Sequence, residues 1–209
     1  MKSIKLAARN YPQNLKNISA APQKLYVNGE LKPTDNLAVA IVGSRKTTQK
    51  GERVARDYAF YLAGQGITVI SGLARGIDTI VHAVSLSAQG RTIAVVANGL
   101  DRIYPPENKS LAKKITENGA IISEFEPGTS PLAENFLSRN RIISGLSLAV
   151  LVIEGARRSG TLSTASYAGS QGREVFAISG SEATDWLLSR GATEAKSPLQ
   201  ILEYLQSQV

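Results

Sequence analysis

The sequence predicts an α/β fold in which helices cover both faces of a doubly wound, mostly parallel sheet. Apolar runs of strand length alternate along the chain with longer segments of helical character. The apolar runs are continuous and rich in β-branched residues, as in strands that are buried on both faces of a parallel sheet. Regular alternation of such strands with helices is typical of doubly wound folds.

The predicted strands begin after a polar opening that contains prolines. Six runs follow in order: LAVAIV at 37–42, ITVIS at 67–71, RTIAVVA at 91–97, AIISEF at 120–125, SLAVLVIE at 147–154 and EVFAIS at 174–179. Between them lie four segments with helical character: KGERVARDYAFYLAGQG, IDTIVHAVSLSAQG, ENKSLAKKITENG and TLSTASYAGSQG. Each of the four closes on glycine, a common signal at the C-terminus of a helix.

The same pattern divides the chain into three parts. Residues 1–36 form a lead-in that we expect to pack on the domain, and residues 37–181 form the central α/β domain. Residues 182–209 are predicted to be a helical extension of that domain, because SPLQILEYLQSQV closes the chain with helical character.

Composition favours a polyanionic partner. The 209 residues carry a formal net charge of +7, which suits a nucleic acid or an acidic membrane surface, and charge alone leaves both open. The chain has no cysteine and a single histidine, His82, so thiolate chemistry and a multi-histidine metal site are not expected. No apolar run reaches the roughly 18 residues of a membrane span. The basic N-terminus lacks the apolar core of a secretory signal, so we expect a cytoplasmic protein that does not contact membranes.

Glycine and arginine follow several of the predicted strands. In open α/β sheets, ligands bind outside the carboxyl ends of the strands, so these loops indicate the site. Glycine allows close approach to a phosphate, and arginine offers a planar fork of donors for it. Together the loops favour anion binding, although tight strand-to-helix geometry alone would also explain any single glycine. The loop residues are Gly43, Ser44 and Arg45; Ser71, Gly72, Arg75 and Gly76; Arg102; and Arg157, Arg158, Ser159, Gly160 and Thr161.

None of these loops is a standard nucleotide fingerprint. The segment GSRKTT lacks the second and third glycines of GxGxxG, and no GxxxxGK[ST] occurs. An NAD-dependent dehydrogenase and a P-loop ATPase are therefore disfavoured, and no cofactor is expected. Glu124, Glu126 and Glu154 follow strands, where they could serve in acid/base chemistry, but we expect them to pair with nearby arginines. His82 is predicted to be structural, and Asp78 to complement the start of a helix.

The segment AENFLSRNRIISG at 133–145 brings an aromatic residue, two arginines and an asparagine together. Arg139 and Arg141 stand two residues apart, so on a helix they do not share a face. We expect one to line a nucleic-acid groove and the other to pair with a structural acidic residue. Asn140 is predicted to fix the turn before the next strand. Phe136 is predicted to contact a base, although a core phenylalanine would look the same in the sequence.

Long motifs in succession resemble the DNA-processing protein A family, also called DprA or Smf. They are IVGSRKTTQKG, ITVISGLARGIDTIVHAVSLSAQGRTIAVVANGLDRIYPPEN and FLSRNRIISGLSLAVLVIEGARRSGTLSTASYAGSQGREVFAISG. With YPQNL and PQKLYVNGEL of the lead-in, the similarity covers about residues 11 to 195. Compared with many members, FLSRNR lacks a proline before the arginine, AISGS replaces a usual PG, and the accessory N- and C-terminal domains are not evident.

The resemblance implies an extended Rossmann-like fold and a protein that binds single-stranded DNA without enzymatic turnover. Such a protein protects incoming DNA in natural transformation or recombination, assists loading of a RecA-type recombinase and commonly forms a homodimer. The family motifs place the DNA-binding residues at Gly43, Ser44 and Arg45; at Ser71, Gly72 and Gly76; at Phe136, Arg139, Asn140 and Arg141; and at Arg158, Ser159, Gly160 and Thr161.

Two alternatives use the same pocket differently. Lonely Guy-type phosphoribohydrolases carry a PGGxGTxxE loop where this chain has ARRSGTLST. Aligning the Gly-Thr pair places Thr164 at the catalytic glutamate, and threonine cannot act as the general base. A nucleotide-binding sensor without turnover remains open, and it would bind mononucleotides tightly and oligonucleotides weakly.

Overall fold

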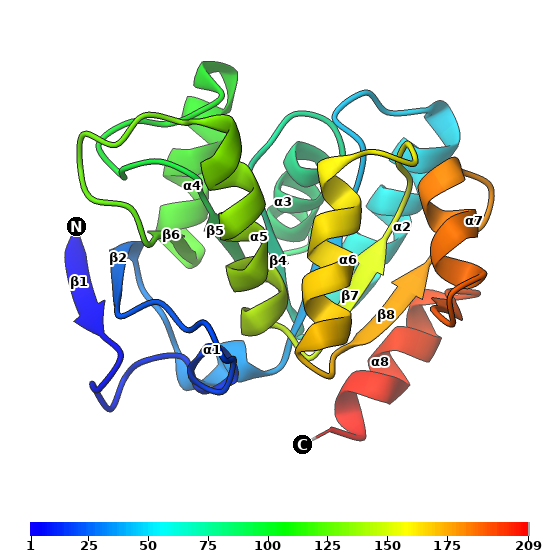
Figure 1. Ribbon diagram of the computed structural model, residues 1–209, viewed down its shortest axis with the longest axis horizontal. Coiled ribbons are helices and arrows are strands. Elements are labelled where there is room, and N and C mark those ends of the chain that lie inside the picture. The colour runs from blue at the N-terminus through cyan, green and yellow to red at the C-terminus, as the bar shows by residue number, and fades with distance from the viewer. Residues whose placement is uncertain (209) are drawn as a thin grey trace.

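One sheet runs through the protein, and a computed structural model describes it for residues 1–208 (Figure 1). Among these residues its strand order is β1-β2-β6-β5-β4-β3-β7-β8-β9. Every pairing from β6 through to β9 is parallel, and β1 and β2 are antiparallel. The strands are β1 (Lys2–Lys5), β2 (Lys24–Gly29), β3 (Ala38–Val42), β4 (Thr68–Ser71), β5 (Thr92–Val95), β6 (Ala120–Ser123), β7 (Ala149–Val152), β8 (Glu174–Ala177) and β9 (Thr193–Glu194).

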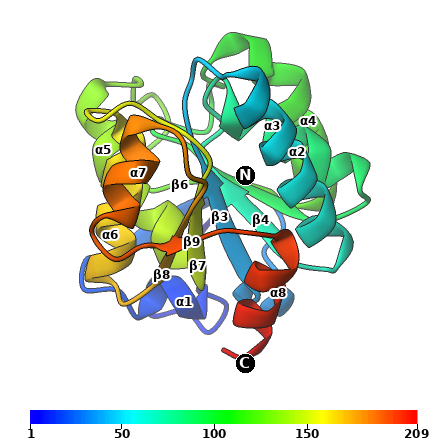
Figure 2. The same cartoon turned by 90° about the vertical axis from the view of Figure 1, so that its right-hand side faces the viewer.

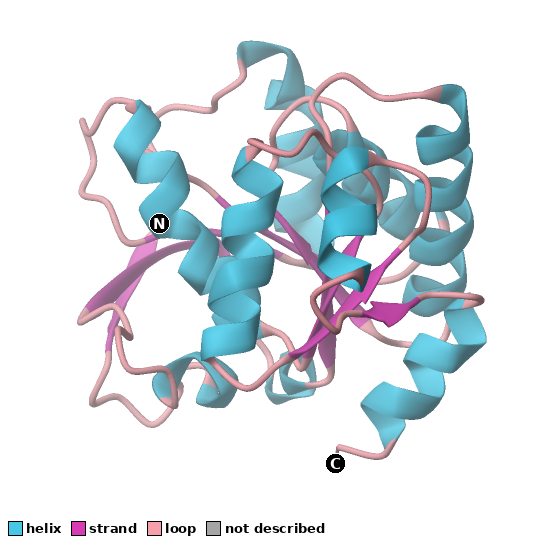
Figure 3. Cartoon of the chain, turned by 45° about the vertical axis from the view of Figure 1, so that its right-hand side comes forward, coloured by secondary structure: helices cyan, strands magenta, loops and turns pink. Residues whose placement is uncertain are grey.

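Helices cover both faces of this sheet, which confirms the predicted fold class (Figures 2 and 3). The helices are α1 (Gln13–Lys16), α2 (Gln49–Gly64), α3 (Ile77–Ser87), α4 (Lys109–Asn118), α5 (Ala133–Leu146), α6 (Gly160–Ser170), α7 (Glu182–Leu188) and α8 (Pro198–Gln206), with short 3-10 turns at Pro33–Asn36 and Pro106–Asn108. Buried residues of α1, α5, α6 and α7 pack on one face of the sheet, and those of α2, α3, α4 and α8 pack on the other.

The central strands explain why the sequence pattern was informative. All residues of β3, β4, β5, β6 and β7 are buried, so each strand must be apolar or hydrogen-bonded on both of its faces. Ser71 of β4 meets this requirement by donating its hydroxyl to the Ile41 carbonyl at 2.7 Å. The six predicted strands all form, and no end is shorter than predicted by more than two residues.

The lead-in packs into the core of the domain and also extends the sheet by two strands. Strand β2 pairs antiparallel with β6, with Tyr26 opposite Ser123, and β1 pairs with β2. The sequence KLYVNG of β2 alternates between buried and more exposed residues, which is the half-buried pattern rather than a continuous apolar run. The C-terminal part also contributes a strand, β9, which pairs with β8 and so is not purely helical.

The chain reverses direction across the sheet between β3 and β7. From β3 it proceeds to β4, β5 and β6 on one side, and α5 then returns it to β7 on the other side of β3. Ligands of open α/β sheets bind outside the carboxyl ends of the strands at such a switch point. In Figure 1, α5 and α6 both begin toward the top of the molecule, above the arrowhead of β7. No helix within residues 1–208 combines the length and apolarity needed to cross a membrane.

Candidate nucleic-acid interface

A cavity of about 800 Å³ lies at the switch point. Its wall is built from the loops after β3, β4, β5, β6 and β7 together with residues of α3, α5 and α6. The lining residues are Val42, Gly43, Ser44, Arg45, Lys46, Ala74, Asp78, Tyr104, Pro131, Ala133, Phe136, Leu137, Arg139, Asn140, Ile143, Ala156, Ser159, Gly160, Thr161 and Thr164. Nine of the predicted DNA contacts are among them: Gly43, Ser44, Arg45, Phe136, Arg139, Asn140, Ser159, Gly160 and Thr161.

The loop after β3 is held in place from two sides. The Ser44 carbonyl accepts the Ile77 N–H at the start of α3, at 3.1 Å. The Thr161 hydroxyl of α6 donates to the Gly43 carbonyl at 3.2 Å. A Cβ on Gly43 would collide with the Ile77 side chain, so only glycine allows this close approach. The fixed loop presents Arg45 to solvent at the mouth of the cavity.

Phe136 is the aromatic centre of the cavity. The Arg45 guanidinium carbon lies 5.0 Å from the centroid of its ring, and Tyr104 makes an edge-to-face contact with centroids 5.9 Å apart. The ring is half-buried, and Tyr104 is 37% exposed, so neither side chain belongs to the closed hydrophobic core. An aromatic surface flanked by an exposed arginine suits a stacked base and its phosphate.

Arg139 forms the charged floor of the cavity. It is buried, and its Nη1 donates to the carbonyls of Gly72, at 2.8 Å, and Val95. Burial is the main cause that lowers the pKa of Arg139 to about 10, so the side chain is still a cation at neutral pH. Its Nε has no hydrogen-bond partner among residues 1–208, so one buried donor is unused. An anion in the cavity would meet a fixed positive charge.

Asp78 compensates part of this charge from below. Its Oδ2 accepts the N–H groups of Gly72 and Ala74 at 3.2 and 3.3 Å. Burial raises the pKa of Asp78, and the positive charge of Arg139 acts in the opposite direction. A Cβ on Gly72 would collide with Arg139 and Asp78, so Gly72 has to be glycine for this arrangement. Asp78 thus lies in the first turn of α3, and its carboxylate holds the loop before that helix rather than capping the helix.

Asn140 corrects one prediction, because it lies inside α5 and not in a turn before the strand. Its Nδ2 donates to the Gly160 carbonyl at 3.1 Å and to the Ser163 hydroxyl at 2.6 Å. These bonds tie the first turn of α6 to α5. The amino end of α6 therefore opens into the cavity, where its free N–H groups favour an anion.

Arg141 takes the structural role that was expected of one of the two arginines. Its guanidinium makes a paired contact with both Glu124 oxygens, at 2.6 and 2.7 Å, and its Nε donates to the Ala20 carbonyl at 3.0 Å. The side chains of Arg141 and Glu124 are only 15% and 18% exposed. Arg141 thus fastens the lead-in to α5, and the structure does not place it in the cavity.

Five further predicted contacts also lie outside the cavity lining. Ser71 and Gly72 are buried beneath it, and Gly76 has a positive φ of 74° where it touches the Ser44 carbonyl. Arg75 is exposed and pairs with Glu107. Arg158 is exposed but does not line the cavity.

The other titratable residues singled out in the sequence have structural partners. His82 is fully buried, and its Nδ1 lies 2.7 Å from the Thr92 hydroxyl, as expected of a structural histidine. Glu126 pairs with Lys24 rather than with an arginine. Glu154 accepts both the N–H and the hydroxyl of Thr48, which caps α2. No cluster of acidic and histidine side chains within residues 1–208 is arranged to hold a metal ion.

The sequence reasoning missed several wall residues, of which Tyr104 and Lys46 matter most. Tyr104 belongs to the loop NGLDRIYPPEN at 98–108, from which only Arg102 was predicted to face the site. A tyrosine in a loop that follows a predicted strand was the available signal. Leu137 is 51% exposed at the cavity wall, which no periodicity would have distinguished from a core leucine.

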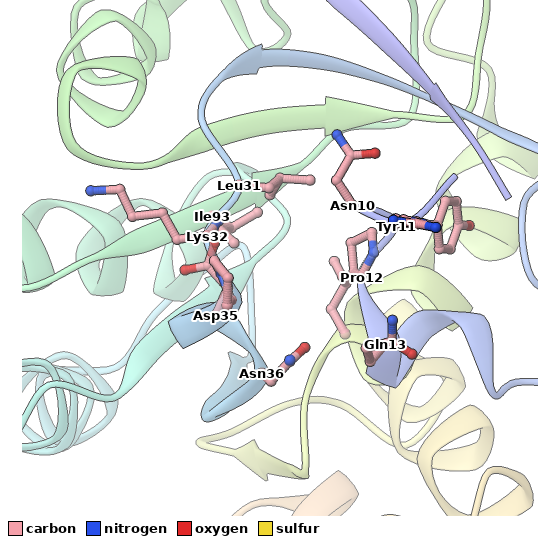
Figure 4. A pocket seen from close by; sticks show the side chains of 12 residues that line it. Asn10, Tyr11, Pro12, Gln13, Leu31, Lys32, Asp35, Asn36 and Ile93 are labelled. Atoms are coloured by element: carbon pink, nitrogen blue, oxygen red, sulfur yellow. Dashed lines mark hydrogen bonds between the residues drawn. The ribbon is translucent and has the colours of Figure 1, made fainter. Parts of the chain in front are cut away.

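A second, smaller cavity of about 200 Å³ lies at the opposite edge of the sheet (Figure 4). Asn36, Ile93 and Leu146 line it, and each lies within three residues of the start of β3, β5 or β7. In Figure 4 the Lys32 side chain extends away from the other labelled side chains. Asp35 is engaged by Arg91 and Thr68. Asp35, the one carboxylate among the described residues of the lining, is therefore already paired, and Arg9 and Lys32 are the cations of the lining.

Comparison with known protein families shows which family the chain belongs to. The sequence model described as DNA recombination-mediator protein A matches residues 2–206. The chain belongs to this family. The resemblance predicted from the motifs is thereby confirmed, and it extends over the lead-in as well as the central domain.

Relatives of this recombination-mediator family are similar over most of the chain. Protein Smf of Escherichia coli is 47% identical over 203 residues, covering 94% of this chain and 54% of that protein. DNA processing protein DprA of Bacillus subtilis is 42% identical over 180 residues, covering 86% of this chain and 61% of that protein. The chain thus spans about half to three fifths of the length of these relatives.

Solved structures agree with the fold. DNA processing protein A from Streptococcus pneumoniae superimposes with a TM-score of 0.90 at 38% identity, over 97% of this chain and 73% of that one. The protein from Helicobacter pylori, described for its single-stranded DNA binding mode, superimposes with a TM-score of 0.87 at 30% identity, over 98% and 99% of the two chains. A molybdenum cofactor binding protein from Rippkaea orientalis, with a TM-score of 0.60 at 17% identity, shares the fold alone.

Proposed function

We propose that the cavity at the switch point binds single-stranded DNA. The observation that carries the proposal is the half-buried ring of Phe136, which lies between exposed Arg45 and Tyr104 above the buried charge of Arg139. Stacking on an aromatic ring tolerates any base and contributes about 1–3 kcal/mol per base. The arginines and the amino end of α6 supply donors to phosphate.

Single strands suit this cavity better than duplexes for a geometric reason. The bases of a duplex are already stacked and paired, so a ring inside a cavity cannot reach their faces. The description of the Helicobacter pylori relative as a single-stranded DNA-binding protein supports the proposal. Binding should have little sequence preference, because the wall offers phosphate donors and a stacking ring rather than a set of base-edge contacts.

The biological role follows from the family. We infer that the protein protects single-stranded DNA during natural transformation or recombination and assists a RecA-type recombinase, acting as a homodimer. Membership of the recombination-mediator family and the DNA-processing names of its relatives support this role.

The contacts of the cavity support binding without turnover. Thr164, at the place of the phosphoribohydrolase glutamate, is buried and carries no basic group. Asp78 is the one carboxylate among the described lining residues, and it is committed to two backbone N–H groups beneath Arg139. A general base has to reach the proton that it abstracts, and the Asp78 carboxylate is held by two N–H groups of the loop after β4.

A nucleotide-binding sensor is the second candidate, and the size of the cavity favours it. A volume of about 800 Å³ falls within the roughly 300–1,000 Å³ of small-molecule sites. The two functions separate in one experiment that compares a single-stranded oligonucleotide, a duplex and a mononucleotide at several salt concentrations. Single-stranded DNA binding predicts the tightest affinity for the oligonucleotide. A mononucleotide that binds as tightly would favour the sensor.

A further inference from the structure

Next to the cavity, Trp186 of α7 holds two arginines. The guanidinium carbons of Arg157 and Arg190 lie 5.0 and 5.5 Å from the centroid of the Trp186 ring. Both arginines are exposed, whereas Trp186 is half-buried and packs against the hydrophobic core on the α5 and α6 face of the sheet. We call these three residues the Trp186 platform. The sequence pointed to Arg157 as a loop residue that favours anion binding, but Trp186 and Arg190 were not among the predicted contacts.

The platform is continuous with the wall of the cavity. Arg157 directly follows Ala156, which lines the cavity, and successive Cα atoms are about 3.8 Å apart. The loop is fixed to α7 by three hydrogen bonds: the Gly155 N–H donates to the Ser181 hydroxyl at 3.1 Å, the Arg157 N–H donates to the Glu182 carboxylate at 3.1 Å, and the Gly155 carbonyl accepts the Ala183 N–H at 3.0 Å. The wall of the cavity and the platform therefore form one supported surface.

The charges of the platform are not neutralised within the described part of the chain. Among residues 1–208, no carboxylate forms an ion pair with Arg157 or Arg190, whereas Arg75, Arg91 and Arg141 each have one. The nearby carboxylates of Glu182 and Asp185 accept backbone N–H groups. A guanidinium that lies over an indole ring still has its N–H groups available to a ligand. A carboxylate would accept hydrogen bonds from those groups, whereas the ring face interacts with the positive charge.

Such an arrangement is suited to phosphate. Holding an arginine against an aromatic ring reduces the side-chain freedom that is lost when the arginine binds a ligand. Each guanidinium presents a planar fork that matches a phosphate group. A single cation–π pair on the surface would not indicate a ligand. Here two arginines without ion pairs among the described residues lie on one ring at the edge of an anion-binding cavity, and together they form a surface suited to successive phosphates.

We propose that the Trp186 platform binds phosphates of the DNA strand after it leaves the cavity. The proposal rests on the proposed function and specifies the path of the bound DNA strand. The strand passes from Phe136 over the loop at Ala156 and then across α7. Arg157 and Arg190 contact the phosphates, and Trp186 is a positioning residue. The platform therefore lengthens the footprint and contributes only to oligonucleotides that extend beyond the cavity.

The test uses oligothymidylates of increasing length, from about 4 to about 16 nucleotides, the range of site sizes in single-strand-binding folds. Affinity is measured at several salt concentrations for the unmodified chain, for Arg157→Ala/Arg190→Ala, and for Lys113→Ala/Lys114→Ala. The last pair removes the same charge from two exposed positions on α4. Loss of two phosphate contacts to single strands predicts a salt slope that is smaller by about 1.4 for the long oligonucleotide in the platform variant. The shortest oligonucleotide should bind the platform variant and the α4 control alike.

Trp186 supplies an independent readout, because it is the only tryptophan of the chain. Its fluorescence should change when the long oligonucleotide binds and stay constant when the shortest one does. If the platform variant binds the long oligonucleotide with the slope of the α4 control, the platform proposal is wrong and the cavity proposal stands. If the unmodified chain binds neither length, both proposals are wrong. A polyglutamate peptide that changes Trp186 fluorescence where long oligonucleotides do not would assign the surface to an acidic protein partner instead.

Discussion

Replacement of Phe136 by alanine gives the most specific prediction about the cavity. The ring is half-buried, contacts Arg45 at 5.0 Å and Tyr104 at 5.9 Å, and lies apart from the closed core. If one base stacks on it, the Phe136→Ala variant should lose about 1–3 kcal/mol of binding free energy, because that is the typical cost of removing one stacking ring. At 1.4 kcal/mol per tenfold, the dissociation constant should rise by roughly 5- to 150-fold.

The assay is fluorescence anisotropy of a labelled oligothymidylate, with thermal unfolding measured on the same samples. Phe136 carries no charge, so the slope of affinity against salt should stay that of the unmodified chain. Phe136→Tyr should bind nearly normally, since it retains the ring. Leu137→Ala is the matched control, because Leu137 is the next residue of α5, lines the same cavity and is 51% exposed.

Two results would refute this reasoning. One is a Phe136→Ala dissociation constant within twofold of the unmodified chain, which would mean that no base contacts the ring. The other is an equal loss in Leu137→Ala, which would mean that apolar contact area rather than stacking accounts for the affinity.

Three further predictions concern the framework of the site. Arg141→Met should lower the free energy of unfolding by about 3 kcal/mol, since it leaves the shielded Glu124 carboxylate without its partner, and chemical denaturation should show this loss with oligonucleotide affinity within twofold of normal. Gly72→Ala should weaken both stability and binding, because the added Cβ displaces Arg139 and Asp78; a variant that binds normally would show that Arg139 is not needed in its place. Burial lowers the pKa of His82 to about 3, so the folded state keeps it neutral while the unfolded state protonates near 6.5. Stability from this residue is therefore complete above pH 6.5 and falls by about 1.4 kcal/mol per pH unit below it, and denaturation between pH 7 and 5 should show a shallower fall in His82→Gln.

The fold was predictable wherever strands are buried on both faces. A strand such as Ala38–Val42 has no exposed position, so its sequence is continuously apolar and stands out from the helices. The strand at Lys24–Gly29 was missed because it alternates and lies toward the edge of the sheet, where polar residues are tolerated. Its place is determined by pairing with Ala120–Ser123, a contact between distant parts of the chain that no local pattern encodes.

The site was predictable from its loops but not from the partners of individual side chains. Position after a strand end was enough to bring Arg45 and Ser159 to one cavity. The separate positions of Arg139 and Arg141 were predictable, because residues that are two positions apart on a helix do not share a face. Asn140 was misassigned because asparagine is common in turns, and here its amide instead joins two helices. Arg75 looked like a ligand contact in the sequence, because its pairing with Glu107 joins two distant parts of the chain.

The central claim is that the cavity binds single-stranded DNA through Arg45 and its neighbours. The most direct test measures the affinity for single-stranded DNA, duplex DNA and a mononucleotide at several salt concentrations. It uses the unmodified chain, Arg45→Ala and, as a single-charge control on α4, Lys113→Ala. We expect the single strand to bind most tightly and with a steep salt dependence, and Arg45→Ala to weaken it and reduce the slope by about 0.7, the share of one phosphate contact. Affinity that does not respond to salt, or that Arg45→Ala leaves at the level of Lys113→Ala, would contradict the account.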